Sequence, residues 1–153
     1  MPKLEYGIET PLSAKQVIGA ATDFTERRLR LWPGIDPKVY EVREVTDRRA
    51  VVREGSAVMG GIWAVEKYDW SVPNEVTATV QESNTFRPGG VWRLRATELP
   101  GGGSKVDVLN HRRPFGTRGA VLGIMLRLMG RPTLRKALAK TMRIVEAETS
   151  TDH

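Results

Sequence analysis

Polar and apolar residues alternate over short runs through the first two thirds of the chain, which is the pattern of half-buried strands. The first run, residues 3–10, ends before Pro11. From residue 38 onward, runs rich in Val, Thr, Tyr and Trp are separated by turn segments short enough for hairpins. We therefore predict six further strands in an antiparallel meander, over residues 38–45, 49–56, 61–70, 75–83, 89–99 and 104–112.

Between the first two strands the spacing of apolar residues becomes helical. Ser13 is a suitable N-cap for a short helix over 13–23, because its hydroxyl can accept a free backbone amide of the first turn. A second short helix is predicted over 24–32, where Pro33 and Gly34 end it. Two short helices thus follow the first strand.

A long helix is predicted after Pro114, and it changes character at Pro132. Between 121 and 129 apolar residues occupy every side and only Arg127 is polar, so this half should be buried on more than one side. The half after Pro132 is amphipathic. Proline in a helix interior costs about 3 kcal/mol and bends the helix, so we expect a kink near Gly130 and Pro132.

These elements predict an α+β fold of one domain over residues 1–149, with a frayed tail at 150–153. A curved antiparallel sheet has one face to cover, and the long helix is the large apolar element available to cover it. The half after Pro132 should pack on the sheet, and the half before it should lean over the open end. A chain of 153 residues, 40% hydrophobic, can bury a core of this kind.

Composition and charge narrow the class of protein further. The chain has no cysteine, so no disulfide or thiolate metal site is expected, and a bacterial-type cytoplasm is the expected location. The N-terminus lacks the apolar core of a signal peptide, and residues 120–129 are too few to span a bilayer. The net charge of +6 comes from scattered arginines, which favours a solvated basic surface over a nucleic-acid partner.

Three segments, taken in order, resemble a known family: 89-GGVWRL-94, the glycine hairpin 101-GGGSKVDV-108, and 126-LRLMGRPTLRKAL-138. With the order of the elements, they resemble the polyketide cyclase/dehydrase-like branch of the START-related helix-grip superfamily (SRPBCC). The resemblance covers nearly the whole chain. It implies a seven-stranded sheet that grips the C-terminal helix around an apolar cavity for lipids or polyketide-like molecules.

Candidate ligand-binding residues follow from strand alternation and from the apolar helix. Trp92 and Leu94 share the core side of their strand, and Asn110 ends an apolar row, where its amide could orient a ligand carbonyl. Trp32 precedes a turn that the resemblance places near the cavity entrance, although it could equally fill the core. The complete predicted set of ligand-binding residues is Trp32, Tyr40, Trp92, Leu94, Asn110, Leu122, Met125, Leu126 and Met129. The methionines suit a wall that adapts to its contents, but they could also fill gaps in the core.

Groups for acid–base catalysis are few. His111 is expected to be an ordinary exposed residue, and Glu66, Tyr68 and Glu82 could transfer protons only if their strands point them inward. The alternation of residues 62–70 does not show which face of this strand points inward. No spacing of His, Asp or Glu suggests a metal, and no cofactor is expected.

Three hypotheses of function remain: a carrier or sensor of a hydrophobic small molecule, which is favoured; a polyketide cyclase, aromatase or dehydratase that uses the same cavity; and a module that contacts a membrane or a protein. No catalytic residue is assigned. The expected partner is a hydrophobic small molecule. The sequence leaves open a transient membrane contact, and it does not decide between a monomer and a homodimer.

Overall fold

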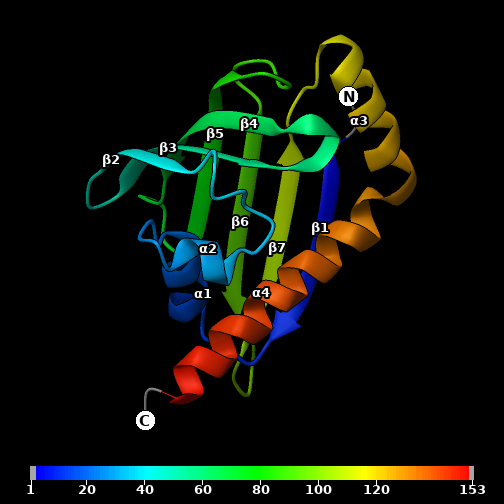
Figure 1. Cartoon of the computed structure of the whole chain (residues 1–153). Coiled ribbons are helices and arrows are strands. Elements are labelled where there is room, and N and C mark those ends of the chain that lie inside the picture. Colours follow the sequence, from blue (N-terminus) through cyan, green and yellow to red (C-terminus); the bar gives the residue numbers. More distant parts are fainter. Residues whose placement is uncertain (1–2, 152–153) are drawn as a thin grey trace.

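A curved antiparallel sheet of seven strands is crossed on its concave face by the long C-terminal helix (Figure 1). The computed structural model describes residues 3–151, with side chains to residue 149. The strands are β1 (Leu4–Thr10), β2 (Glu41–Val45), β3 (Arg49–Ser56), β4 (Ile62–Asp69), β5 (Glu75–Ser83), β6 (Val91–Glu98) and β7 (Ser104–His111). The predicted strands are thus confirmed, with the largest difference at the start of β2.

The strand order is β1-β7-β6-β5-β4-β3-β2, so consecutive strands from β2 to β7 are neighbours and the predicted meander is confirmed. β1 pairs with β7 at the far edge, in a register that runs from Leu4 opposite Asn110 to Thr10 opposite Ser104. The first strand therefore closes the sheet beside the last one. The chain must then cross to the opposite edge to begin β2, and the two short helices make this crossing.

The two short helices lie against the lower end of the sheet (Figure 1). α1 (Ala14–Ala21) begins at Ser13, whose side chain accepts the backbone amide of Gln16 while the Gln16 side chain accepts the amide of Ser13. This reciprocal capping confirms the predicted helix start. α2 (Arg28–Leu31) is one short turn, after which the chain enters the loop that leads to β2.

The C-terminal helix is continuous but irregular. α3 (Gly116–Met125) passes through a π-helical turn, η2 (Leu126–Gly130), into α4 (Arg131–Thr151), and the helix changes direction there (Figure 1). Pro132 has no amide to donate and crowds the preceding turn, so the wider π turn just before it is a physically reasonable way to accommodate the ring. The predicted kink is confirmed. The predicted tail at 150–153 falls partly on residues 152–153, which lie outside the described residues.

The main core lies between α4 and the inner face of the sheet. Leu138, Met142 and Val145 of α4 are buried, as are Leu94 and Val106 of the sheet. Each such side chain contributes about 1.5–3 kcal/mol by its burial. The half of the helix after Pro132 therefore covers the sheet as predicted.

The half before Pro132 does not have the burial that its composition predicted. Ile124, Leu128 and Met129 are 60%, 74% and 57% exposed, and Val121 also faces solvent. α3 lies beside the upper end of the sheet, so only one of its sides meets the protein (Figure 1). The expectation of burial on more than one side is wrong, because no second layer among residues 3–151 covers the outer side of α3.

Candidate functional site

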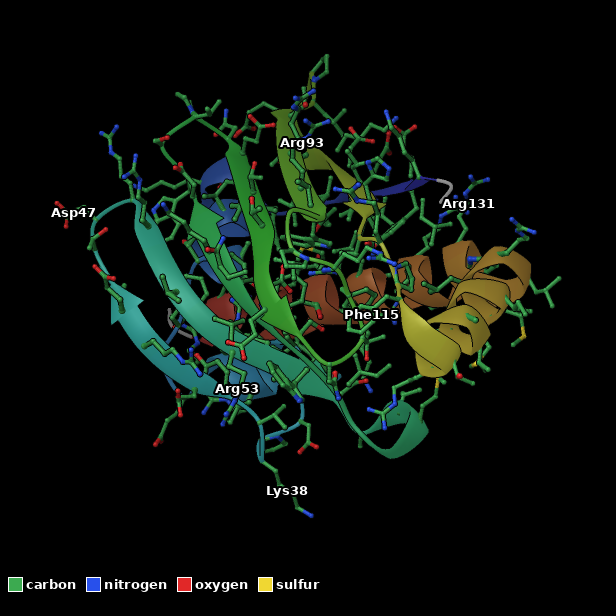
Figure 2. All side chains as sticks on the ribbon, turned by 90° about the horizontal axis from the view of Figure 1, so that it is seen from above. Lys38, Asp47, Arg53, Arg93, Phe115 and Arg131 are labelled. Atoms are coloured by element: carbon green, nitrogen blue, oxygen red, sulfur yellow. The ribbon has the colours of Figure 1, made fainter. Side chains whose placement is uncertain are left out.

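An open pocket of about 340 Å³ lies where α3 meets the loops at the upper end of the sheet. In Figure 2, which looks down on this end, Phe115 lies at the start of α3, on the side that faces the sheet. The guanidinium of Arg87 sits over the Phe115 ring, 6.0 Å from its centre. The pocket is lined by Arg87, Pro114, Phe115, Gly116, Gly119, Ala120, Gly123, Ile124 and Arg127.

A second, much smaller cavity of about 30 Å³ adjoins this pocket. The two share Pro114, Gly123 and Arg127, so they lie side by side. Its remaining lining comes from Leu4, Phe86, Asn110, Arg112 and Leu126. The lining therefore changes from exposed side chains at the mouth to inward-facing residues of β1 and β7 at the inner end.

Local backbone contacts hold α3 over the end of the sheet. The amide of Phe115 donates to the carbonyl of Thr85 at 2.9 Å, and Phe86 and Pro114 form an isolated bridge. Gly119 lies so close to Pro114 that an added Cβ would stand 3.0 Å from its carbonyl carbon. A side chain at 119 would require Pro114 or the first turn of α3 to shift by a few tenths of an ångström, so glycine favours this close approach.

A largely buried ion pair flanks the small cavity, with the side chains of Arg112 and Glu66 18% and 5% exposed. Arg112 follows β7 directly, and its Nη2 donates to both carboxylate oxygens of Glu66 at 2.7 and 2.9 Å. Glu66 is only 4% exposed. Burial alone lowers the pKa of Arg112, but the charge of Glu66 and its hydrogen bonds outweigh this and raise it. Arg112 is therefore a fixed cation, neutralised by one carboxylate.

A second buried polar cluster, Arg28–Glu54–Tyr68, joins α2 to the inner face of β3 and β4. Arg28 Nε donates to Glu54 at 2.6 Å, Arg28 Nη1 donates to the Ala21 carbonyl at 2.9 Å, and the Tyr68 hydroxyl donates to Glu54. Burial, and then the negative charge of Glu54, raises the pKa of Tyr68 well above its usual value. Tyr68 therefore stays a protonated phenol, and the cluster holds α2 on the sheet.

The structure settles the face of residues 62–70 that the pattern left open. Glu66 and Tyr68 are buried on the inner face, whereas Glu82 is exposed. Along β4 the even positions 62, 64, 66 and 68 are buried, and the β-bulge opposite Val65 and Glu66 has its extra residue, Gln81, in β5. Two of the three residues considered for proton transfer therefore point inward, but both are held in the buried clusters. His111 is half-buried at the end of β7.

The predicted ligand-binding residues do not lie together in the structure. Asn110 and Leu126 line the small cavity. Trp92 packs edge to face against Trp32, with 6.5 Å between ring centres, and Leu94 is fully buried in the main core.

The other predicted residues lie elsewhere. The Tyr40 hydroxyl donates to the Phe24 carbonyl at 2.8 Å. Leu122 is half-buried on α3, and Met125 and Met129 are 38% and 57% exposed. A ligand role for these residues stays a prediction.

Sequence reasoning missed the residues that form the pocket and its inner end: Phe115, Gly119, Gly123, Arg112 and their neighbours. One signal was available, because Arg112 is two residues beyond Asn110 and so shares its inward parity. The other residues gave no periodic signal, since they lie in a turn and on one side of a helix that is apolar all round.

Solved structures of other proteins share this architecture. The Thermus thermophilus protein TTHA0849 superimposes with a TM-score of 0.77 at 18% identity, covering 96% of this chain and 99% of its own. The Zhui aromatase/cyclase from Streptomyces sp. R1128 gives 0.79 at 14% identity, covering 97% and 95%. A START superfamily protein from Mycobacterium smegmatis gives 0.70 at 15%, covering 95% and 98%.

The chain has the START-like helix-grip fold. The resemblance seen in the sequence is thereby confirmed at the level of fold, with aromatase/cyclases among the similar structures. No protein-family model matches the sequence, and no curated protein matches it. Within residues 3–151, no helix is both long and apolar enough to cross a membrane. The same residues contain no group of three His, Cys, Asp or Glu side chains that could hold a metal ion.

Proposed function

We propose that this START-like protein binds a small, mostly apolar molecule in the pocket between α3 and the sheet, as a carrier or sensor. The supporting observation is the 340 Å³ pocket itself, which falls within the usual size range of small-molecule sites. Apolar groups of Pro114, Phe115, Ala120 and Ile124 line it, so burial of apolar ligand surface would drive binding.

The lining favours binding over catalysis. The residues that line the two described cavities include arginines and Asn110 but no carboxylate, imidazole or phenol. A cyclase or dehydratase needs an acid or base within reach of its substrate. Glu66 and Tyr68, which could serve, are engaged in buried pairs. A polyketide cyclase that acts in the same pocket, suggested by the aromatase/cyclases of the same fold, is therefore the less favoured proposal.

Fluorescence of the neutral apolar probe N-phenyl-1-naphthylamine tests the binding proposal. Its emission should rise on addition of the protein, and Gly123→Leu, which places a side chain in the lining of both cavities, should suppress this rise. Gly19→Leu is the matched control, because position 19 is exposed on α1 with no atom within 4 Å of an added Cβ. Equal probe binding by both variants would contradict the proposed site.

Solvent extraction of the purified protein, followed by mass spectrometry, would identify the small molecule that it binds. Turnover of an extracted molecule by the protein would favour the cyclase proposal, whereas release of an unchanged molecule would favour the carrier.

A second candidate function is contact with an anionic membrane surface through α3. The exposed residues Val121, Ile124 and Leu128 recur at three- and four-residue spacing and form an apolar stripe. The segment 113–143 holds eight Arg and Lys residues and no acidic residue, and Arg131 points away from the sheet (Figure 2). A second copy would bring like charges together on this surface, so an anionic bilayer fits it better.

Co-sedimentation with vesicles of phosphatidylglycerol and phosphatidylcholine tests this candidate. Leu128→Glu should reduce binding far more than Ala137→Glu, which adds the same charge on an exposed position of α4. Equal binding to vesicles of pure phosphatidylcholine, or equal loss in both variants, would exclude the stripe as the docking surface.

A further inference from the structure

Two arginines line the 340 Å³ pocket without a counter-charge. Arg87 comes from the loop between β5 and β6, and Arg127 comes from η2. Within residues 3–149, whose side chains the structure describes, neither guanidinium forms an ion pair, and no acidic side chain lines the pocket. Other exposed arginines are paired, such as Arg49 with Asp69 at 3.3 Å. The pocket therefore holds two positive charges that no described acid balances.

The local structure places both arginines at the wall of the pocket. The Arg87 amide donates to the Arg113 carbonyl at 2.8 Å, which holds the loop against the end of β7, and the Arg87 guanidinium lies over the Phe115 ring. Contact with the face of a ring leaves the N–H donors of a guanidinium free for other partners. Arg127 follows Gly123 by four residues, about one helical turn, so it lies on the side of the helix that lines the pocket. Both cations therefore border the same space.

Apolar surface borders the two charges. Phe115 and Ile124 line the same pocket and are 38% and 60% exposed, so a bound molecule can cover them and gain from their burial. Arg87 and Arg127 are exposed as well, so a charged group beside them stays in contact with water and avoids the cost of burying a charge. The pocket therefore suits a molecule with one apolar part and one charged part.

The sign of the two charges decides which charged part fits. A cationic group would be repelled by both guanidinium groups, and a neutral group would leave their mutual repulsion unbalanced. An oxyanion is attracted by both, and its two or three oxygens match the forked N–H donors of arginine. The pocket thus favours a carboxylate, a sulfonate or a phosphate ester.

We propose that Arg87 and Arg127 bind the anionic head group of an amphiphile whose apolar body lies against Phe115 and Ile124. This inference rests on the proposed function and names its ligand class: a small molecule with an oxyanion at one end and an apolar body at the other. The head group lies at the exposed rim of the pocket, and the apolar body covers the pocket wall. Arg87 and Arg127 are then the residues that determine specificity for acids.

Two fluorescent probes that share one aromatic body test the inference on the unmodified protein. 8-Anilinonaphthalene-1-sulfonate carries an anionic group, and N-phenyl-1-naphthylamine is the same body without it. Between about 20 mM and about 500 mM NaCl the sulfonate probe should lose about fivefold in affinity, because salt screens exposed charges, whereas the neutral probe should not weaken. Decanoate and decyl phosphate should displace the sulfonate probe at lower concentration than decan-1-ol does, and the more effective of the two acids identifies the preferred head group.

Two variants then locate the charge. Arg87→Gln and Arg127→Gln should each weaken the sulfonate probe about threefold to fivefold and change the affinity of the neutral probe by less than about twofold. Arg131→Gln is the matched control, because it removes the same charge at an exposed position one turn further along the helix and outside the pocket lining. This control should leave the affinities of both probes unchanged.

The outcomes separate this inference from the proposed function. If the neutral probe binds but the sulfonate probe shows no salt dependence, or if Arg131→Gln weakens it as much as Arg127→Gln does, the head-group role is overturned and the apolar pocket stands. If neither probe binds, both proposals are overturned. If the pocket variants lose only their binding to anionic vesicles, the arginines belong to a membrane-contact surface and this inference is overturned. The salt comparison needs no variant, so it decides the matter even if a variant does not fold.

Discussion

Replacement of Glu54 by glutamine tests whether the ion pair between α2 and β3 is as buried as the structure shows. Arg28 and Glu54 are 3% and 9% exposed, and their charged atoms are 2.6 Å apart. Removing one partner of a buried pair costs about 3–5 kcal/mol, because the other charge is left uncompensated in a medium of low dielectric. Glutamine keeps the shape and one acceptor oxygen, so we expect a loss of about 3 kcal/mol in the free energy of unfolding.

Calorimetry and urea denaturation at pH 7 provide the measurement. For a domain of this size, 1 kcal/mol lowers Tm by about 2–4 °C, so Glu54→Gln should lower Tm by about 6–12 °C. Tyr68→Phe removes one hydroxyl from the cluster and should cost about 1–2 kcal/mol. Circular dichroism at 20 °C should show that both variants remain folded before they are compared.

A double variant separates the charge effect from the loss of packing. Arg28→Met combined with Glu54→Leu removes both charges and keeps apolar volume, so it should be less destabilised than Arg28→Met alone. A cost below about 1 kcal/mol for Glu54→Gln would be typical of an exposed pair and would refute the reasoning. Strict additivity of the two single changes would refute it as well.

Three further predictions concern local features. Gly55→Ala should lower the free energy of unfolding by about 2 kcal/mol or more in urea denaturation, because its Cβ would overlap the Ile62 carbonyl of the neighbouring strand; an unchanged midpoint would show that the strands separate easily there. Ser13→Ala should cost about 1 kcal/mol by loss of the cap on α1, with Ser13→Gly losing less. The hydrogen bond from Arg27 holds the pKa of Glu148 below its ordinary 4.5, so this pair stabilises the fold above pH 4.5 and loses its effect as the pH falls through the lowered value. Thermal melts of Glu148→Gln should therefore differ from those of the unmodified protein at pH 7 and converge with them near pH 3, and a difference that persists at low pH would contradict this assignment.

The strands and helices could be predicted because each carries its own local signal. Alternation along residues 104–112 defines the face that holds Val106, Val108 and Asn110, and Ser13 and Pro132 mark where helices begin and bend. A local signal fails where structure depends on distant neighbours. The bulge at Gln81 of β5, opposite Val65 and Glu66, arises from the pairing of β4 with β5, and the sequence of β5 does not show it.

The candidate site could be predicted only in part, for the same reason. Asn110 and Leu126, two of the predicted residues, line the small cavity, and their ligand role stays a prediction. The pocket itself arises from the way Pro114 and Phe115 dock on the loop at Thr85, which brings together segments about thirty residues apart in sequence. Met125 was expected to face the interior, but the apolar surface of α3 exceeds what the end of the sheet can cover.

By itself, the sequence determined the elements, their order, the antiparallel meander and the bend at Pro132, because periodicity, capping and proline geometry act within a few residues. The tertiary structure alone decided that Glu66 meets Arg112, that Arg112 Nε is buried without a hydrogen-bond partner among the described residues, and that half of an apolar helix faces solvent. These features depend on which surfaces meet when the sheet curves and the helix crosses it, and no local pattern carries that information.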